Sequence, residues 1–179
     1  MIDAIAAEIG FFEALFRPLL AAELQKATYL TFGGVERLRG RFSADASFQA
    51  TLNACVSRLP FAACVVEAQM VHKKNEIAAL TSRQQSLFPP QLPPPKRLRL
   101  TLVVTNSGGR RMGLHELLRV PETSALWEAY HEDYATGAAE NLGDWEHSGT
   151  SLSSLAVRVE ARRLDDRVLG LIQAVDRSS

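Results

Sequence analysis

The sequence is poor in cysteine and carries no excess charge of either sign. Among 179 residues there are only two cysteines, Cys55 and Cys64, and 20 basic side chains are matched by 20 acidic ones. Two cysteines without a Cys-x-x-Cys spacing cannot form a disulfide framework, so we expect two buried thiols in a protein of the cytoplasm or nucleus. A net charge of zero argues against a protein whose main role is to coat nucleic acid, and leaves only a local basic patch as an alternative.

Long uncharged runs are also missing. Asp3, Glu8 and Glu13 interrupt the hydrophobic N-terminus, and no basic residue precedes it, which is the reverse of a secretory signal. We therefore expect no membrane-spanning segment and no membrane partner. The length and a hydrophobic content of 46% predict a globular protein of one domain, or of one domain with a helical extension.

Familiar catalytic and metal-binding motifs do not occur. The sequence contains no His-Glu-x-x-His or Cys/His grouping, no Gly-Lys-Ser/Thr phosphate loop and no Gly-x-Ser-x-Gly elbow. The neighbours His131, Glu132 and Asp133 would point in different directions on a helix, so they cannot converge on one ion without help from elsewhere. We predict no catalytic residue, no metal and no cofactor.

What the sequence does contain is a broad apolar helical pattern at its N-terminus. Apolar residues recur at three- and four-residue steps and would share one helical face, although Gly10 and Pro18 should weaken or bend the helix. These residues are Ile2, Ile5, Ile9, Phe12, Phe16 and Leu19. The face either packs on the chain's own core or docks into a partner or a second copy, and Phe12, Phe16 and Leu19 would then bind that partner.

Prolines divide the chain near its middle. Five prolines between residues 89 and 95 predict an extended, stiff connector, with a ligand for an aromatic-lined groove as the alternative. We expect a helix-rich part at 1–87, a proline-rich connector at 88–96 and an α+β part at 97–179, or one continuous domain. The predicted fold class is α+β, with a helical N-terminal half and a small sheet with packed helices in the C-terminal half.

Local patterns predict the individual elements. Before the connector we expect a turn at Phe32-Gly33-Gly34, a helix capped by Ser43 and containing Phe48 to Val56, and a strand and then a helix between 61 and 87, where either element fits. After the connector we expect strands at 98–104 and 154–163, and helices at 114–118, from Pro121 to about Tyr134, and beyond Asp165. A hairpin turning at Asp165 and Asp166 is the alternative to the last helix.

A glycine-rich basic loop follows the strand expected at 98–104. Glycines let backbone N–H groups approach an anion, and a following helix N-terminus would add partial positive charge, so Gly109, Arg110, Arg111 and Gly113 are candidate anion-binding residues. The segment Arg110-Arg111-Met112-Gly113-Leu114-His115 resembles the pyrophosphate loop of the GNAT family of N-acetyltransferases, Arg/Gln-x-x-Gly-x-Gly/Ala. The resemblance covers residues 98–118 and departs from the family at His115, where a small residue is usual. It implies an acyl-CoA-dependent N-acyltransferase; an ordinary Asn/Gly turn is the alternative.

An acidic stretch with spaced aromatic residues comes next. No Lys or Arg occurs between Val120 and Val157, and Trp127, Tyr130 and Tyr134 are spaced as one stripe of a helix. Such a stripe either seals a helix onto its domain or binds a partner, since Trp and Tyr are common anchors. The sequence therefore favours a non-catalytic interaction or assembly subunit of an intracellular complex, whose partners are other protein subunits or a second copy.

Overall fold

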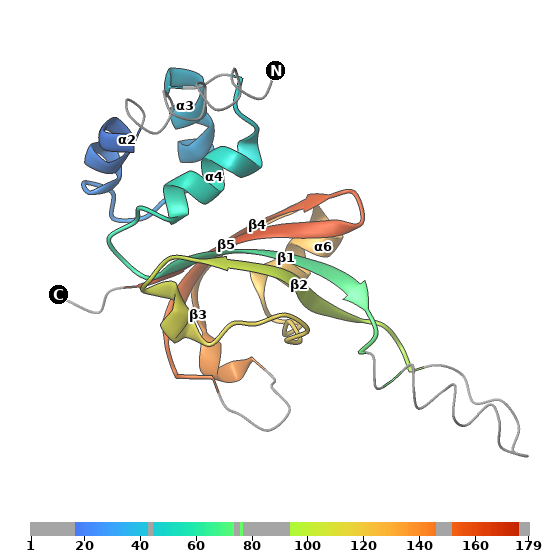
Figure 1. Cartoon of the computed structure of the whole chain (residues 1–179). Coiled ribbons are helices and arrows are strands. Elements are labelled where there is room, and N and C mark those ends of the chain that lie inside the picture. The colour runs from blue at the N-terminus through green and yellow to red at the C-terminus, as the bar shows by residue number, and fades with distance from the viewer. Residues whose placement is uncertain (1–16, 43–44, 74–75, 77–93, 146–151, 176–179) are drawn as a thin grey trace, which may run out of the picture.

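The chain folds around a five-stranded antiparallel sheet in a computed structural model that describes residues 17–42, 45–73, 76, 94–145 and 152–175. The elements, in chain order, are α2 (Arg17–Leu24), α3 (Phe32–Phe42), α4 (Phe48–Val56), β1 (Ala63–Val71), β2 (Arg97–Thr105), η2 (Gly109–Met112), α6 (Ala125–Glu132), β3 (Tyr134–Asn141), η3 (Leu142–Asp144), β4 (Ala156–Leu164) and β5 (Arg167–Ala174). Helices α2, α3 and α4 lie together on one side of the sheet, and α6 lies behind it on the other (Figure 1).

The order of the strands across the sheet is β2-β1-β5-β4-β3. Strand β1 precedes the prolines in the sequence, yet it pairs with β2 on one side and with β5 on the other. Both parts of the chain therefore contribute to one sheet.

Alternating side chains of the central strands fill two separate apolar layers. On β1 and β5, Val65, Leu169 and Leu171 point toward α2, α3 and α4, whereas Val66 and Ile172 point toward α6. This division follows from the two-residue period of a strand, which sends successive side chains to opposite faces. A strand covered on both faces is apolar throughout, as β5 is from Val168 to Ile172.

The C-terminal segment is a hairpin, so the helix predicted beyond Asp165 is wrong. Strands β4 and β5 pair in register from Val157 with Ala174 to Leu164 with Arg167, and the chain turns at Asp165, which has φ of 57°, and Asp166. An uninterrupted apolar run suits a fully covered strand as well as a helix, which is why spacing alone could not separate them.

Two further helix predictions need correction. No helix occurs at 114–118: the chain forms the short η2 at Gly109–Met112, and then Leu117 and Leu118 exchange backbone hydrogen bonds with Leu100 of β2. The helix expected from Pro121 begins only at Ala125, behind the N-cap Ser124, and ends at Glu132. Tyr134 therefore opens β3, a strand that the sequence analysis did not predict.

The starts of α3 and α4 also differ from the sequence-based predictions. The turn predicted at Phe32-Gly33-Gly34 is the first turn of α3. The N-cap of α4 is Ser47, whose hydroxyl accepts the N–H of Ala50, whereas Ser43 lies outside the described residues.

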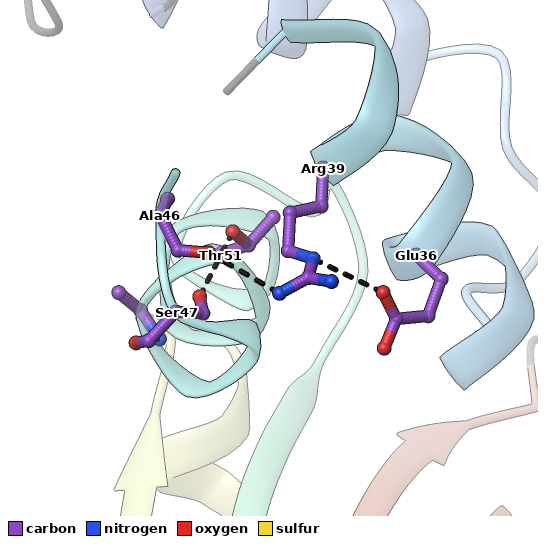
Figure 2. Close-up of polar contacts among 6 residues, drawn as sticks. Glu36, Arg39, Ala46, Ser47 and Thr51 are labelled. Atoms are coloured by element: carbon purple, nitrogen blue, oxygen red, sulfur yellow. Dashed lines mark hydrogen bonds and ion pairs between the residues drawn. The ribbon is translucent and has the colours of Figure 1, made fainter. Parts of the chain in front are cut away.

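Figure 2 shows how α3 meets the start of α4. The Nε of Arg39 pairs with Glu36 Oε2 at 3.1 Å, and its Nη1 donates to the carbonyl of Ala46 at 3.4 Å. At the first turn of α4, the hydroxyl of Thr51 donates to the carbonyl of Ser47. Arg39 and Glu36 both lie on α3 and are partly exposed, so their ion pair adds little stability, and the hydrogen bond to Ala46 is the contact that reaches the segment before α4.

The α+β class is confirmed, and so are the strands expected at 61–72, 98–104 and 154–163, which are β1, β2 and β4. The narrower prediction of a helical N-terminal half is not confirmed, because β1 belongs to that half. The helix expected at 77–87 lies outside the described residues, and so does most of the proline segment. The two prolines of that segment that the structure describes, Pro94 and Pro95, are exposed.

Candidate functional site

The face of β4 that is turned toward α3 and α4 carries three charged side chains. Arg158, Glu160 and Arg162 alternate along the strand with Val157, Val159 and Ala161, which lie in the layer under α6. The period of two visible in this segment of the sequence is the signal that could have marked the charged face. The sequence does not indicate that helices cover part of this charged face.

Glu160 ties this face to the beginning of α3. The residue is only 4% exposed, and its Oε2 accepts the N–H of Phe32 at 2.9 Å while its Oε1 accepts the hydroxyl of Tyr134 at 3.0 Å. A carboxylate suits this place because the first N–H groups of a helix have no partner within the helix and carry partial positive charge. Loss of hydration and the hydrogen bond to Glu160 raise the pKa of Tyr134 above its ordinary value.

Gln173 holds Leu30, two residues before α3, with two hydrogen bonds. Its Oε1 accepts the N–H of Leu30 at 2.6 Å, and its Nε2 donates to the carbonyl of Leu30 at 2.8 Å. Gln173 is 1% exposed, so both of its polar atoms have partners in a place that water does not reach. The neighbouring Tyr29 is thereby held at a fixed place beside β4.

Both arginines of the β4 face lie against aromatic rings. The guanidinium carbon of Arg158 is 4.3 Å from the ring centroid of Tyr29, and that of Arg162 is 4.0 Å from the ring of Phe48. Such contacts suit the planar, weakly hydrated guanidinium. The Nε atoms of both arginines are buried and donate to no acceptor among the described residues, so neither guanidinium has all its donors engaged there.

A hollow of about 390 Å³ opens beside Arg158. Its walls are largely apolar and come from the loop before α3, the loop before β1 and the end of β5. The lining residues are Ala27, Thr28, Tyr29, Pro60, Phe61, Arg158, Gln173, Ala174 and Val175. Arg158 is the only charged side chain among the described residues that line it, and it lies beside a largely apolar wall.

A second hollow, of about 640 Å³, lies between α2 and α3 and shares the loop Ala27–Tyr29 with the first. Leu24 and Leu38 supply apolar wall, and three charged residues line it: Glu23, Arg37 and Arg41. Glu23 and Arg41 form an ion pair at 3.2 Å. Two arginines against one glutamate give the described lining of this hollow a net charge of +1.

Exposed apolar side chains gather around Arg158. Among the described residues five large hydrophobic side chains are exposed: Tyr29, Leu102, Leu117, Tyr134 and Val175. Tyr29 and Val175 line the first hollow, and the hydroxyl of Tyr134 binds Glu160, two residues along β4 from Arg158. We call Tyr29, Tyr134, Arg158 and Val175 the Arg158 surface.

The structure separates the three aromatic residues that the sequence analysis placed on one stripe. Trp127 and Tyr130 lie on α6, where both rings contact the ring of His131, with centroid distances of 5.0 and 5.3 Å. Tyr134 lies on β3 and reaches Glu160 on the opposite face of the sheet. Helical spacing misplaced it because α6 ends at Glu132, and Asp133 turns the chain with φ of 68°.

Trp127 and Tyr130 are half-buried and pack against the apolar layer under α6. Arg163 covers Tyr130, with its guanidinium carbon 5.1 Å from the ring centroid, and donates to the carbonyl of Tyr130 at 2.9 Å. Much of the area that these two rings could offer to a partner is therefore used within the chain.

Most of the partner-binding residues that were predicted on the first helix are not among the residues that the structure describes. Phe12 and Phe16 lie outside the described residues, and Leu19 lies on α2 without a described side chain. On the same helix Leu20 and Leu24 are buried in the layer between the helices and the sheet.

The glycine-rich loop uses its backbone N–H groups internally. The N–H of Gly109 donates to Asn106 Oδ1 at 2.7 Å, and those of Arg110, Arg111 and Gly113 donate to carbonyls within the same loop. Arg110 and Arg111 are exposed, and no helix begins behind the loop. The geometry is therefore that of an Asn-fixed turn, which leaves these four N–H groups occupied rather than directed at an anion.

The two cysteines are free and buried. Burial raises the pKa of both thiols to about 12, which keeps them protonated at neutral pH. Within the described ranges, no group of three or more His, Cys, Asp or Glu side chains could hold a metal ion.

Comparison with known protein families and with curated proteins gives no match for this chain. Among the described helices none is long and apolar enough to cross a bilayer.

Proposed function

We propose that the protein is a non-catalytic interaction or assembly subunit of a complex in the cytoplasm or nucleus, and that it binds a partner protein at the Arg158 surface. The observation that carries this proposal is the grouping of three exposed apolar side chains with a half-buried arginine. Tyr29 is 50% exposed, Tyr134 53% and Val175 39%. Tyrosine and arginine, together with tryptophan, are the side chains that most often anchor protein interfaces, because each combines a large apolar area with a polar group.

The rigidity of this surface supports the same proposal. Gln173 fixes the backbone beside Tyr29, and Glu160 fixes the hydroxyl of Tyr134. Side chains that are already held in place lose less conformational entropy when a partner binds. Trp127 and Tyr130, which are half-buried, would form at most a secondary contact.

Affinity capture with paired variants tests the proposal. The full chain and the double variant Tyr29→Ser/Tyr134→Ser are used to capture proteins from a lysate of the source cells, and the captured proteins are compared by mass spectrometry. The matched control is Leu102→Ser/Leu117→Ser, which removes two exposed apolar side chains from β2 and the segment beside it.

We expect a reproducible set of captured proteins that is lost with the tyrosine variant and kept with the control, while circular dichroism shows both variants folded. Equal capture by the wild type and a folded tyrosine variant would contradict the proposal.

A further inference from the structure

We infer that the hollow beside Arg158 receives the C-terminal residue of a partner protein, with its terminal carboxylate on Arg158 and its apolar side chain against the wall of the hollow. This inference rests on the proposed function, because it names the partner group that the Arg158 surface would bind.

The positive charge of Arg158 favours an anionic ligand in the hollow. Among the described residues that line the hollow, Arg158 is the only charged one. The nearby carboxylate of Glu160 is already engaged by the N–H of Phe32 and the hydroxyl of Tyr134. A guanidinium binds a carboxylate through two parallel N–H···O bonds, so a carboxylate is the group that fits it best.

The apolar wall of the hollow favours an apolar side chain next to that carboxylate. Pro60, Phe61 and Val175 offer an apolar surface beside the single arginine. A C-terminal residue presents a carboxylate and an apolar side chain from the same Cα atom, which matches this pairing. An internal Asp or Glu would instead bring a polar side chain with backbone continuing in both directions, and the apolar wall would face it without a partner.

The adjoining hollow between α2 and α3 makes a peptide a better-fitting ligand than a small carboxylic acid. Because both hollows share Ala27, Thr28 and Tyr29, one extended segment can reach from Arg158 past Tyr29 to Leu24, Leu38 and Arg37. The net positive charge of the described residues that line the second hollow favours an acidic residue a few positions before the C-terminus of the peptide. A free small acid would fill only the first hollow.

A display library of random peptides with free C-termini tests the inference on the full chain. Peptides of about six residues suffice, since these span roughly 20 Å when extended. Selected peptides are then synthesised with a free carboxylate and with a C-terminal amide, and their affinities are measured by fluorescence anisotropy. The protein variants are Arg158→Gln and Arg162→Gln, of which the second changes an arginine that also stacks on aromatic rings but does not line the hollow.

We expect selected peptides to end in an apolar residue, and to lose about tenfold or more in affinity as amides and toward Arg158→Gln. Affinity for Arg162→Gln should stay within about twofold of the wild type, a difference well below the tenfold step of about 1.4 kcal/mol. If Arg158→Gln does not fold, Val175→Asp replaces it. Val175 is exposed, and a carboxylate placed there would repel that of the peptide with the same expected loss.

Three results would overturn the inference: no selectable peptide, equal binding of acid and amide, or undiminished binding to a folded Arg158→Gln or Val175→Asp variant. If one of these occurs while Tyr29→Ser/Tyr134→Ser still loses its captured proteins, only the C-terminal occupant is wrong. If that capture is also unaffected, the proposed function fails as well.

Discussion

At the scale of single residues, two buried polar side chains decide where the N-terminal helices sit. Glu160 and Gln173 come from neighbouring strands, and both reach the backbone of Leu30–Phe32, at the entry to α3. Burying a polar group is unfavourable unless it is hydrogen-bonded, so each of these side chains suits only one position of the helices. The same contacts set Tyr29 and Tyr134 beside Arg158, which joins the packing of the helices to the candidate binding surface.

Glu140 supplies a prediction at this scale. Its carboxylate accepts the N–H of Ala125 at the first turn of α6, at 2.8 Å. Burial nevertheless raises its pKa above the ordinary 4.5, although hydrogen bonds from Ala125, Ser124 and Trp145 act in the opposite direction. The folded state then holds the proton more tightly than the unfolded state, so this contribution to stability is complete below pH 4.5 and is lost as pH rises through the raised pKa.

We therefore expect Glu140→Gln, which does not titrate, to gain stability relative to the wild type as pH rises. The measurement is the free energy of unfolding in urea for both proteins at about pH 4.5 and at neutral pH. Glu140 lies on β3, and the control is Glu128→Gln at an exposed position of α6, the helix whose first turn Glu140 contacts; this variant should show a smaller change. If the free energies of unfolding of the wild type and Glu140→Gln differ by the same amount at both pH values, burial does not raise the pKa of the Glu140 carboxyl.

At the scale of elements, close backbone approaches fix the loop after β2. A Cβ atom at Gly109 would overlap the carbonyl oxygen of Ala63, a backbone atom that cannot rotate away. Asn106 reinforces the contact, since its side chain accepts the N–H of Ala63 and donates to the carbonyl of Phe61. The glycine of this segment is thus needed for packing against the start of β1, which explains its presence without an anion.

Gly109→Ala and Gly40→Ala should change stability in opposite directions. We expect Gly109→Ala to lower the free energy of unfolding by about 3 kcal/mol, because the new methyl group overlaps backbone. Gly40 is exposed on α3 with nothing within 4 Å of the position of a Cβ atom, so its replacement should raise stability by about 0.5–1 kcal/mol through helix propensity.

Urea unfolding followed by circular dichroism measures both effects. A Gly109→Ala variant as stable as the wild type would show that the loop can move away from β1, and would reopen the question of what its N–H groups bind.

At the scale of the whole molecule, the position of β1 joins the two parts of the chain. It lies between β2 and β5, and its side chains enter both apolar layers. Among the described strands β2 pairs with β1 alone, so removing β1 would leave β2 unpaired there and would uncover one edge of β5, and neither part keeps its packing without the other.

We therefore expect one cooperative unfolding transition. Trp127 and Trp145 report on the layer under α6, while circular dichroism also follows α2, α3 and α4 on the other face. Tryptophan fluorescence and far-ultraviolet circular dichroism should give the same midpoint in urea. Two distinct midpoints would show that 1–87 and 97–179 unfold separately, as the proline connector alone would predict.

Local sequence patterns are sufficient to predict the elements for which they allow one interpretation. Alternation predicted β2 and β4, and helical spacing predicted α4 and the centre of α6, whereas β1 was expected as a strand although a helix also fitted its spacing. Strand β3 was missed because Tyr-Ala-Thr-Gly-Ala-Ala-Glu-Asn has little strand propensity, and it is a strand because β4 offers it backbone partners. For β5, an apolar run fits a covered strand and a helix equally well, and only pairing with β1 and β4 decides between them.

The candidate site was decided almost entirely by tertiary structure. The sequence pattern predicted Tyr134 as a partner-binding residue but placed it with Trp127 and Tyr130, and no pattern pointed to Arg158 or Tyr29. These two residues are 129 positions apart, and only the packing of the loop before α3 against β4 brings them within 4.3 Å. Local patterns report on neighbours in the chain, whereas a binding surface depends on long-range contacts that form only when the apolar faces of several elements are buried together.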